Sequence, residues 1–207
     1  MTGRAAKNGD TLGHVPDSSP VALLLVDVIN DMEFDGSDPL VRQAVPMAKR
    51  IAALKRRARK AGIPAVYIND NFGRWQSDFR KLVHHCLNDG VKGEEVCRLL
   101  EPAEDDYFVL KPKHSAFFET SLDTLLRYLG ARTLILTGIA GNICILFSAN
   151  DAYMRDYRLI VPEDCVVSNT PEDNRRALHQ IQTVLKGDTT QSDDIDLEAI
   201  LRRGGDA

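Results

Sequence analysis

The chain has 207 residues, of which 43% are hydrophobic and 27% charged, and its formal net charge is -4. These values are typical of one soluble globular domain with a sizeable core, and the mildly negative charge argues against a nucleic-acid partner. No apolar run approaches the roughly 18 residues of a membrane-spanning helix. We therefore expect no nucleic-acid or membrane partner and a cytoplasmic location.

Residues 1–18 are polar and rich in Gly, Pro, Asp and Ser, without the apolar stretch of a secretion signal. We interpret them as a flexible N-terminal arm that precedes a single domain over residues 19–207, because no repeat or linker interrupts the remainder. The cysteines lack metal-type spacing and are interpreted as reduced thiols. They are Cys86, Cys97, Cys144 and Cys165.

Apolar runs alternate along the chain with amphipathic stretches. The apolar runs predict strands at 21–26, 65–68, 107–110, 133–137 and 159–161, a sixth strand at 183–185, and only a loop or strand extension at 165–167. The amphipathic stretches predict helices at 44–61, 79–87, 121–129, 145–155, 171–182 and within 193–207. The basic stretch 55–60 is interpreted as a solvated helix face. This alternation predicts an α/β fold, a three-layer α/β/α sandwich with a central, mainly parallel six-stranded sheet.

Three chemically useful residues stand at the ends of predicted strands, namely Asp27, Lys111 and Cys144. Parallel strands bring their carboxyl ends to one sheet edge, where open α/β sheets bind ligands, so the three side chains can converge there. Each also has an ordinary explanation. Asp27 can cap a helix, Lys111 can be a solvated charge, and Cys144 can be a small core residue.

Cys144 follows a Gly-rich turn at the start of a helix-compatible segment. The positive end of the helix dipole favours a thiolate at this position. A nearby carboxylate such as Asp27 can take the thiol proton as general base, an ammonium group such as Lys111 stabilises the thiolate, and backbone N–H groups can hold an oxyanion. The three residues therefore form a coherent hypothetical catalytic triad.

Three segments occur in a characteristic order at these strand ends: Leu25-Val26-Asp27 followed by Asn30-Asp31, then Lys111-Pro112-Lys113-His114-Ser115-Ala116-Phe117, then Thr137-Gly138-Ile139-Ala140-Gly141-Asn142-Ile143-Cys144. Together they resemble the signature blocks of the isochorismatase-like cysteine hydrolases. That family includes nicotinamidases, isochorismatase, and the N-carbamoylsarcosine, biuret and ureidoacrylate amidohydrolases.

The resemblance implies a Rossmann-like topology and a role for each member of the triad. Asp27 would be the general base, Cys144 the nucleophile and Lys111 the charge that activates it. The resemblance also implies a cis peptide bond between Ile139 and Ala140, with the N–H groups of Ala140 and Cys144 forming the oxyanion hole. A homo-oligomer, either a dimer or a tetramer, is a further implication.

The chain departs from the nicotinamidases after the second predicted strand, where those enzymes carry an Asp-x-His motif that binds a metal. The matching stretch here is Asp70-Asn71-Phe72, and no His replaces the ligand. We therefore expect neither a metal nor another cofactor, and nicotinamide is a less favoured substrate. The expected pocket residues are Phe34, Asn71, Phe72, Trp75, Phe117 and Asn142, with Trp75 covering a small substrate.

The presence of Cys144 favours hydrolysis of a C–N bond, in a small-molecule amide or ureide, through a thioester intermediate. Three alternatives stay open. The first is an isochorismatase-type vinyl-ether hydrolase that uses Asp27 without covalent catalysis. The second is a non-catalytic α/β small-molecule-binding protein. The third is a redox thiol protein, although the sequence has no Cys-x-x-Cys.

Overall fold

The computed structural model describes residues 18–71 and 78–205. Its sheet has six parallel strands: β1 (Val21–Val26), β2 (Ala65–Asp70), β3 (Tyr107–Lys111), β4 (Thr133–Ile139), β5 (Arg158–Ile160) and β6 (Val166–Val167). The strand order is β3-β2-β1-β4-β5, and β6 pairs with β4. The predicted arm lies outside the described residues apart from its last position, so its boundary with the domain stays a prediction.

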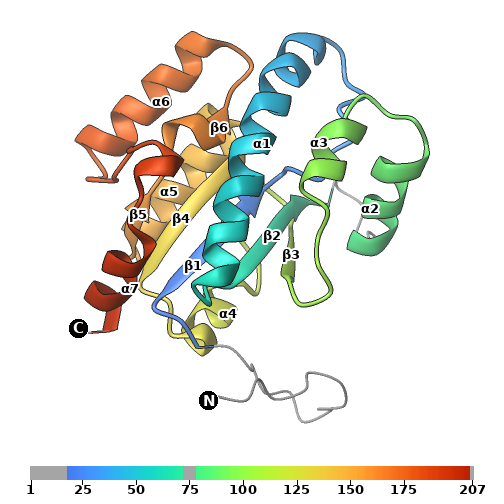
Figure 1. The fold of residues 1–207 in the computed structure, drawn as a ribbon. Coiled ribbons are helices and arrows are strands. Elements are labelled where there is room, and N and C mark those ends of the chain that lie inside the picture. Colours follow the sequence, from blue (N-terminus) through green and yellow to red (C-terminus); the bar gives the residue numbers. More distant parts are fainter. Residues whose placement is uncertain (1–17, 72–77, 206–207) are drawn as a thin grey trace.

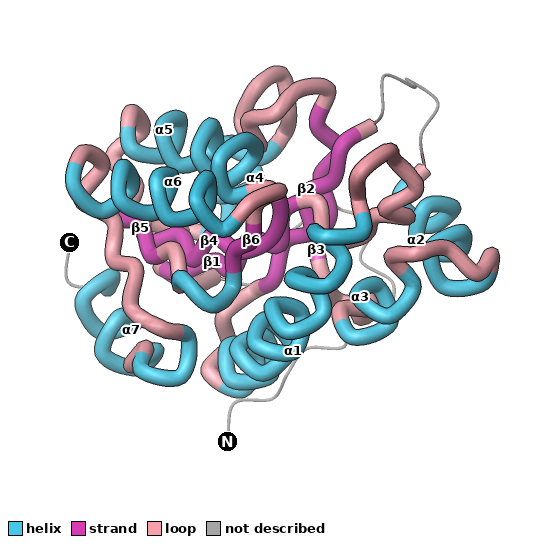
Figure 2. Tube along the Cα trace, turned by 90° about the horizontal axis from the view of Figure 1, so that it is seen from above, coloured by secondary structure: helices cyan, strands magenta, loops and turns pink. Residues whose placement is uncertain are grey.

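Seven α-helices connect or follow these strands in the described residues: α1 (Asp38–Lys60), α2 (Phe79–Asn88), α3 (Glu94–Leu99), α4 (Leu122–Leu129), α5 (Leu146–Tyr153), α6 (Pro171–Thr183) and α7 (Leu197–Gly205). Three short helical turns complete the set: η1 (Gly141–Ile145), η2 (Glu163–Cys165) and η3 (Ser192–Asp194). Viewed along the sheet, α1, α3 and α7 lie on one face and α4, α5 and α6 on the other (Figures 1 and 2). The predicted three-layer sandwich is confirmed.

The central strand β1 supplies side chains to both faces of the sheet. Because successive side chains of a strand point to opposite faces, Val21, Leu23 and Leu25 pack against the α1 layer. Ala22 and Leu24 pack, with Val26, against the α4 and α5 layer. All six residues of β1 are fully buried, which explains why the strand reads as an unbroken apolar run.

Helix α1 begins six residues before its predicted start at 44. Pro39 lies in its first turn, where a missing N–H is tolerated, and Pro46 lies inside the helix. The predicted range already contained Pro46, and the missed first turn includes Pro39, a residue that is typical of turns and loops. Helix α1 ends at Lys60, and Gly62 follows with a positive φ of 75°.

The sixth strand is β6, and the strand predicted at 183–185 is wrong. Helix α6 continues to Thr183, the N–H of Val184 donates to the carbonyl of Gln180, and the Val184 side chain is exposed. The two residues of β6 pair with the carboxyl end of β4, beyond the point where β5 leaves it. A two-residue strand is too short to carry a periodic signal.

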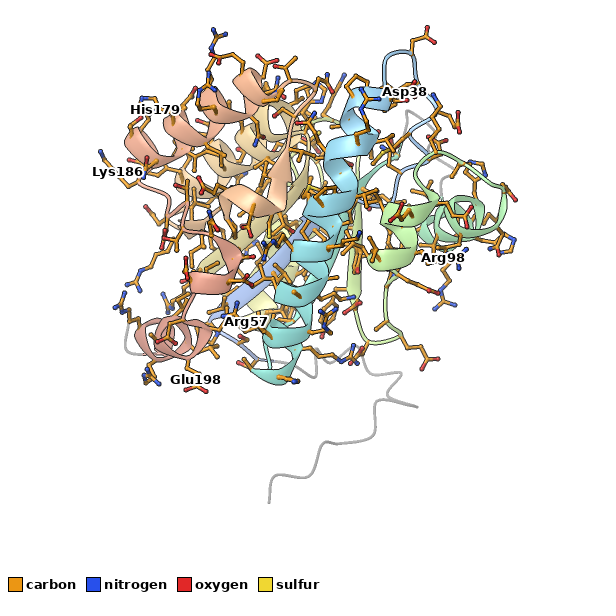
Figure 3. All side chains as sticks on the ribbon, turned by 45° about the horizontal axis from the view of Figure 1, so that its top comes forward. Asp38, Arg57, Arg98, His179, Lys186 and Glu198 are labelled. Carbon is orange, nitrogen blue, oxygen red and sulfur yellow. The ribbon has the colours of Figure 1, made fainter. Side chains whose placement is uncertain are left out.

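The interpretation of 55–60 as a solvated face is wrong for two of its cations. The Nζ of Lys55 donates to the hydroxyl of Tyr67 at 2.8 Å and forms an ion pair with Asp106. Arg57 donates to the backbone carbonyls of Ser192 in η3 and of Ile195 directly after η3, and Figure 3 shows it on the side of α1 that faces this segment. These two side chains bind α1 to neighbouring segments, so they stabilise the fold and are not free surface charges.

Within the described residues, no helix combines the length and the apolar character needed to cross a membrane.

Candidate active site

Asp27 follows β1 directly and its carboxylate is held across the carboxyl edge of the sheet. Its backbone N–H donates to the carbonyl of Ile68 at 2.8 Å, and its Oδ1 accepts the N–H of Asp70 at 2.8 Å. Its φ is 52°, in the left-handed region that Asp tolerates better than most residues. Burial and these bonds argue against a simple helix cap.

Lys111 ends β3 and its side chain is fully buried. The Nζ lies 2.9 Å from Asp27 Oδ2 and 3.5 Å from Asp70 Oδ2, and it donates to Cys144 Sγ at 3.5 Å. An ammonium group has three N–H donors, and these three acceptors account for them. Lys111 is therefore a buried, paired cation at the centre of the site rather than a solvated charge.

Cys144 lies in the turn η1, which follows β4. The penultimate residue of β4 must be a glycine, since Gly138 has a φ of 120° and a Cβ there would lie 2.0 Å from the carbonyl oxygen of Val26. The peptide bond between Ile139 and Ala140 is cis, as the resemblance implies. Cys144 is half-buried, and its Sγ accepts the hydrogen bond from Lys111 Nζ.

A network behind the turn fixes its position. The N–H of Asn142 donates to Ser168 Oγ at 3.0 Å, and the Ser168 hydroxyl donates to Asn174 Oδ1 at 2.9 Å. Asn174 in turn donates to the carbonyl of Val166 at 3.0 Å. A Cβ on Gly141 would lie 2.3 Å from Asn174 Oδ1. The glycine therefore lets α6 and β6 hold the turn closely, and no sequence signal had indicated this role for Ser168 or Asn174.

A second set of contacts joins the segment after Lys111 to the helix that carries Cys144. The hydroxyl of Ser148 donates to the carbonyl of Cys144 at 2.6 Å and accepts the N–H of Ala116 at 2.9 Å. Ser115 donates to the carboxylate of Asp151. Two of the three sequence blocks are thus connected by hydrogen bonds.

Burial is the largest single influence on the pKa of each of the three groups. Burial raises the pKa of Asp27, although Lys111 opposes the shift. Burial and then the charge of Asp27 raise the pKa of Cys144 to about 12, again against Lys111. The pKa of Lys111 is raised because Asp27 and Cys144 outweigh its own desolvation. At neutral pH Cys144 is therefore a thiol, and the thiolate expected from the helix dipole forms only when a base takes the proton.

A cavity of about 320 Å³ opens beside Cys144. Its described polar lining residues are Asp27, Asn30, Asp70, Cys144 and Asn169, and its apolar lining residues are Met32, Phe34, Leu40, Ile139, Ala140 and Ile143. A larger hollow of about 1110 Å³ lies elsewhere, between the end of α5, β5 and α7. None of the three triad residues lines that hollow, so convergent chemistry and not size identifies the site.

The predicted pocket residues do not all line the cavity beside Cys144. Phe34 lines the cavity. Phe117 does not, which corrects its prediction: it is buried in the core under α4 and α5, with its ring 5.9 Å from that of Tyr157. Asn71 and Asn142 are also outside the lining; the N–H of Asn71 donates to the carbonyl of Lys111 at 3.0 Å. Phe72 and Trp75 lie outside the described residues.

Sequence reasoning missed several walls of the cavity. Asn169 follows β6 by two residues, so a correct placement of the sixth strand could have found it. Met32 comes from the segment between β1 and α1 and Leu40 from the first turn of α1, and no periodic signal marks them. Among the described residues, no group of three or more His, Cys, Asp and Glu side chains is arranged to hold a metal ion.

Comparison with known proteins agrees with this geometry. A family model described as the isochorismatase domain matches residues 21–193. The chain belongs to the isochorismatase family. This isochorismatase-family hydrolase is 45% identical over 174 residues to the isochorismatase family protein YaaI of Bacillus subtilis (strain 168), a match that covers 84% of this chain and 95% of that protein.

Two further relatives carry activities in their names. The ureidoacrylate amidohydrolase RutB of Methylorubrum extorquens is 28% identical over 81% of this chain and 78% of that protein. The crystal structure of N-carbamoylsarcosine amidase from Thermoplasma acidophilum superposes with a TM-score of 0.67 and 30% identity, covering 85% of this chain and 98% of that one.

Proposed function

We propose that this chain is a cysteine-dependent hydrolase that cleaves the C–N bond of a small amide or ureide through a thioester on Cys144. The observation that carries the proposal is the meeting of three groups at one pocket. Lys111 Nζ lies 2.9 Å from Asp27 Oδ2 and 3.5 Å from Cys144 Sγ, so the carboxylate and the thiol both contact the same ammonium group. The names of two relatives, an amidohydrolase and an amidase, support the same reaction class.

The first half of the reaction forms the thioester. Asp27 accepts the proton of the Cys144 thiol as general base, and the sulfur attacks the substrate carbonyl carbon. Lys111 stabilises the negative charge that develops on sulfur. The C–N bond then breaks, Asp27 gives its proton to the leaving nitrogen, and ammonia or an amine departs.

Backbone N–H groups of the turn are assigned to the oxyanion. The N–H groups of Ile143 and Ile145 donate to the carbonyl of Ala140, and that of Asn142 donates to Ser168 Oγ. These three donors are engaged within the protein, and we assign the oxyanion hole to the N–H groups of Ala140 and Cys144, as the family resemblance implies. Such preorganised donors stabilise a tetrahedral intermediate strongly.

The second half returns the enzyme to its starting state. Asp27 takes a proton from a water molecule, whose oxygen attacks the thioester carbonyl. The C–S bond breaks, the acid product leaves, and the sulfur recovers the proton from Asp27. Lys111 stays protonated throughout and serves as a fixed positive charge.

Asp27→Asn and Cys144→Ala variants test this assignment in an ammonia-release assay over a panel of amides and ureides. Each is expected to lower kcat by at least about 10³-fold, the loss that follows removal of a base or nucleophile in comparable sites. An active Cys144→Ala variant would instead favour chemistry by Asp27 without a covalent step, as in a vinyl-ether hydrolase. Full activity in both variants would refute the assignment of the site.

A further inference from the structure

The middle sequence block, from Lys111 to Phe117, is only partly used by the proposed mechanism. Lys111 supplies the ammonium group of the site, whereas Phe117 is buried in the core and is not among the described residues that line the cavity. The segment after Lys111 reaches α4 only at Leu122. The contacts of this segment with the rest of the protein therefore indicate what else it does.

The sheet alone does not set the distance between Lys111 and Cys144. Lys111 ends β3, which stands at one end of the strand order, and Cys144 follows β4, so β2 and β1 lie between the two strands. At a spacing of about 4.8 Å between neighbouring strands, β3 and β4 are roughly 14 Å apart. The 3.5 Å contact between Lys111 Nζ and Cys144 Sγ therefore depends on how the segments beyond the strand ends are held.

One hydroxyl joins these two segments. Ser148 lies in the first turn of α5, four residues after Cys144, and is fully buried. Its Oγ donates to the carbonyl of Cys144 at 2.6 Å and accepts the N–H of Ala116 at 2.9 Å. Helical serines often bond back to the carbonyl four residues earlier, and the oxygen can still accept a donor from elsewhere. Here that donor comes from the segment after β3, and we call these two hydrogen bonds the Ser148 bridge.

A second contact attaches the same segment to α5 through Asp151. The hydroxyl of Ser115 donates to the carboxylate of Asp151 and accepts the N–H of Phe117 at 3.1 Å. The same carboxylate accepts a hydrogen bond from Arg155 at 2.8 Å. The Arg155 guanidinium lies 4.9 Å from the centre of the Phe117 ring. Ser115 and Phe117 are thus both held against the helix that follows the candidate nucleophile.

We propose that Ser148 is a positioning residue of the reaction, whose bridge to Ala116 keeps the ammonium group of Lys111 in contact with the sulfur of Cys144. The proposal rests on the proposed function, and it adds a residue that acts through others, since Ser148 is not among the described residues that line the cavity. Without the hydroxyl, the buried N–H of Ala116 loses its acceptor, which is unfavourable. The segment is then expected to shift towards a new acceptor and to carry Lys111 with it.

Alkylation of Cys144 by iodoacetamide tests the proposal without a substrate. The thiolate is the reacting form of cysteine, and the ammonium group of Lys111 stabilises it. The rate at one fixed alkaline pH therefore reports how well that group is placed, and peptide mapping assigns the rate to Cys144. Ser148→Ala is expected to slow this alkylation about tenfold, an effect typical of residues coupled in one network.

Ser19→Ala is the matched control. The Ser19 hydroxyl is also buried, and within the described part of the chain it likewise donates to a carbonyl and accepts an N–H, both of Val21. It lies outside the site, so its removal should leave the alkylation of Cys144 unchanged. A rate that is also unchanged in Ser148→Ala would overturn the proposal.

A double-mutant cycle with Lys111→Met distinguishes positioning from a general effect on structure. If Ser148 acts through the ammonium group, its hydroxyl has little left to position once that group is absent. The loss caused by Ser148→Ala is then expected to shrink from about tenfold to less than about twofold in the Lys111→Met background. An equal loss in both backgrounds would overturn the proposal, because Ser148 would then act independently of Lys111.

Ser115→Ala provides a second test in case Ser148→Ala does not fold, which urea denaturation checks. This variant removes the contact with Asp151 and leaves the Ser148 bridge in place. We expect it to slow alkylation about threefold, and to do so only while Lys111 is present. Slowing by the same factor in the Lys111→Met background would contradict the idea that this segment acts through the ammonium group.

Ammonia release gives a readout that a merely structural role would not move. For Ser148→Ala we expect kcat per folded enzyme to fall about tenfold and KM to stay within about twofold, as for a loss confined to the transition state. Ser148→Thr keeps a hydroxyl and should recover most of the loss, and a folded Thr variant as slow as Ser148→Ala would count against the bridge. Activity that survives Cys144→Ala would remove the thioester but would leave the coupling of Ser148 to Lys111 standing.

Discussion

Cys144 and Cys165 have thiols of nearly equal acidity and very different surroundings. Burial raises the pKa of each to about 12. Cys165 lies in η2 with no exposed surface, beside Asp164 and Ser192. Cys144 opens onto a cavity and has the ammonium of Lys111 3.5 Å from its sulfur.

The two sites differ in what can happen after the proton leaves. At Cys144 the carboxylate of Asp27 is placed to accept it, and Lys111 compensates the charge that remains on sulfur. Cys165 has a carboxylate neighbour, but its sulfur has no route to a ligand. A raised thiol pKa therefore does not separate a structural cysteine from a candidate nucleophile. A base, a buried cation and an opening together do so.

Serine substitution at the two cysteines should produce the largest contrast. Cys144→Ser is expected to lower kcat by at least about 10³-fold, because a hydroxyl is a far weaker nucleophile at this position. Cys165→Ser should leave kcat within about threefold, while the buried hydroxyl lowers the free energy of unfolding by about 1–3 kcal/mol. Ammonia release and urea denaturation measure the two effects. Equal losses of kcat in the two variants would contradict the assignment of Cys144 as nucleophile and Cys165 as a structural residue.

Substitution of two lysines should separate catalysis from stability. Lys111→Met removes the cation beside Cys144, and we expect kcat to fall about 10²–10³-fold, as for loss of a preorganised electrostatic group. Lys55→Met is the matched control, since Lys55 is also largely buried and paired with an aspartate, Asp106. It should lower stability by about 3 kcal/mol and spare kcat in the folded fraction. A fully active Lys111→Met enzyme would contradict the role of the cation.

The pH profile should show that the thiol is protonated at rest. Asp27 must be ionised to act as a base, so kcat/KM falls about tenfold per pH unit as pH drops through its pKa, which burial raises above the ordinary 3.8. The rate should stay flat through about pH 9, because Cys144 loses its proton only near 12. Burial lowers the pKa of Lys111, but the charges of Asp27 and Cys144 together outweigh burial and raise that pKa, so loss of its proton is not expected to lower the rate in this range. A rate that rises with a midpoint near pH 9 would point to an ordinary free thiol.

The network behind the turn should give the smallest effect. Ser168→Ala removes the acceptor for the N–H of Asn142, and we expect kcat to fall about fivefold, the equivalent of roughly 1 kcal/mol for one hydrogen bond. KM should change little, because Ser168 does not line the cavity. Ser19→Ala removes a buried hydroxyl whose hydrogen bonds, within the described part of the chain, go to nearby Val21, and it should leave kcat unchanged. If the two variants had the same kcat, Ser168 would have no role in positioning Cys144.

The sequence was sufficient to predict the first five strands of the sheet and the convergence of Asp27, Lys111 and Cys144. Buried parallel strands read as apolar runs, and their carboxyl ends share one edge, so a residue that ends a strand is placed by the strand itself. The short strand β6 was predicted only as a loop or strand extension at 165–167, because two residues carry no period. Asn169, which follows it, was missed for the same reason.

The walls of the pocket could not be predicted as well. Phe117 stands next to a sequence block that surrounds the site, yet its side chain turns into the core beneath α4 and α5. Met32 reaches the cavity from the segment between β1 and α1, whose path depends on tertiary contacts such as the N–H of Gly93 donating to the carbonyl of Asp31. Leu40 reaches it from the first turn of α1. Loop conformation, which local sequence constrains weakly, decides which side chains a substrate meets.

A covalent mechanism requires that Cys144 becomes acylated during turnover. An acid quench during hydrolysis of an amide or ureide, followed by intact mass spectrometry and peptide mapping, measures this acylation. We predict one added acyl group, equal to the substrate less its leaving amine or ammonia, on the peptide that contains Cys144 and on no peptide that contains Cys165. Turnover without any adduct, together with an active Cys144→Ala variant, would contradict the thioester mechanism.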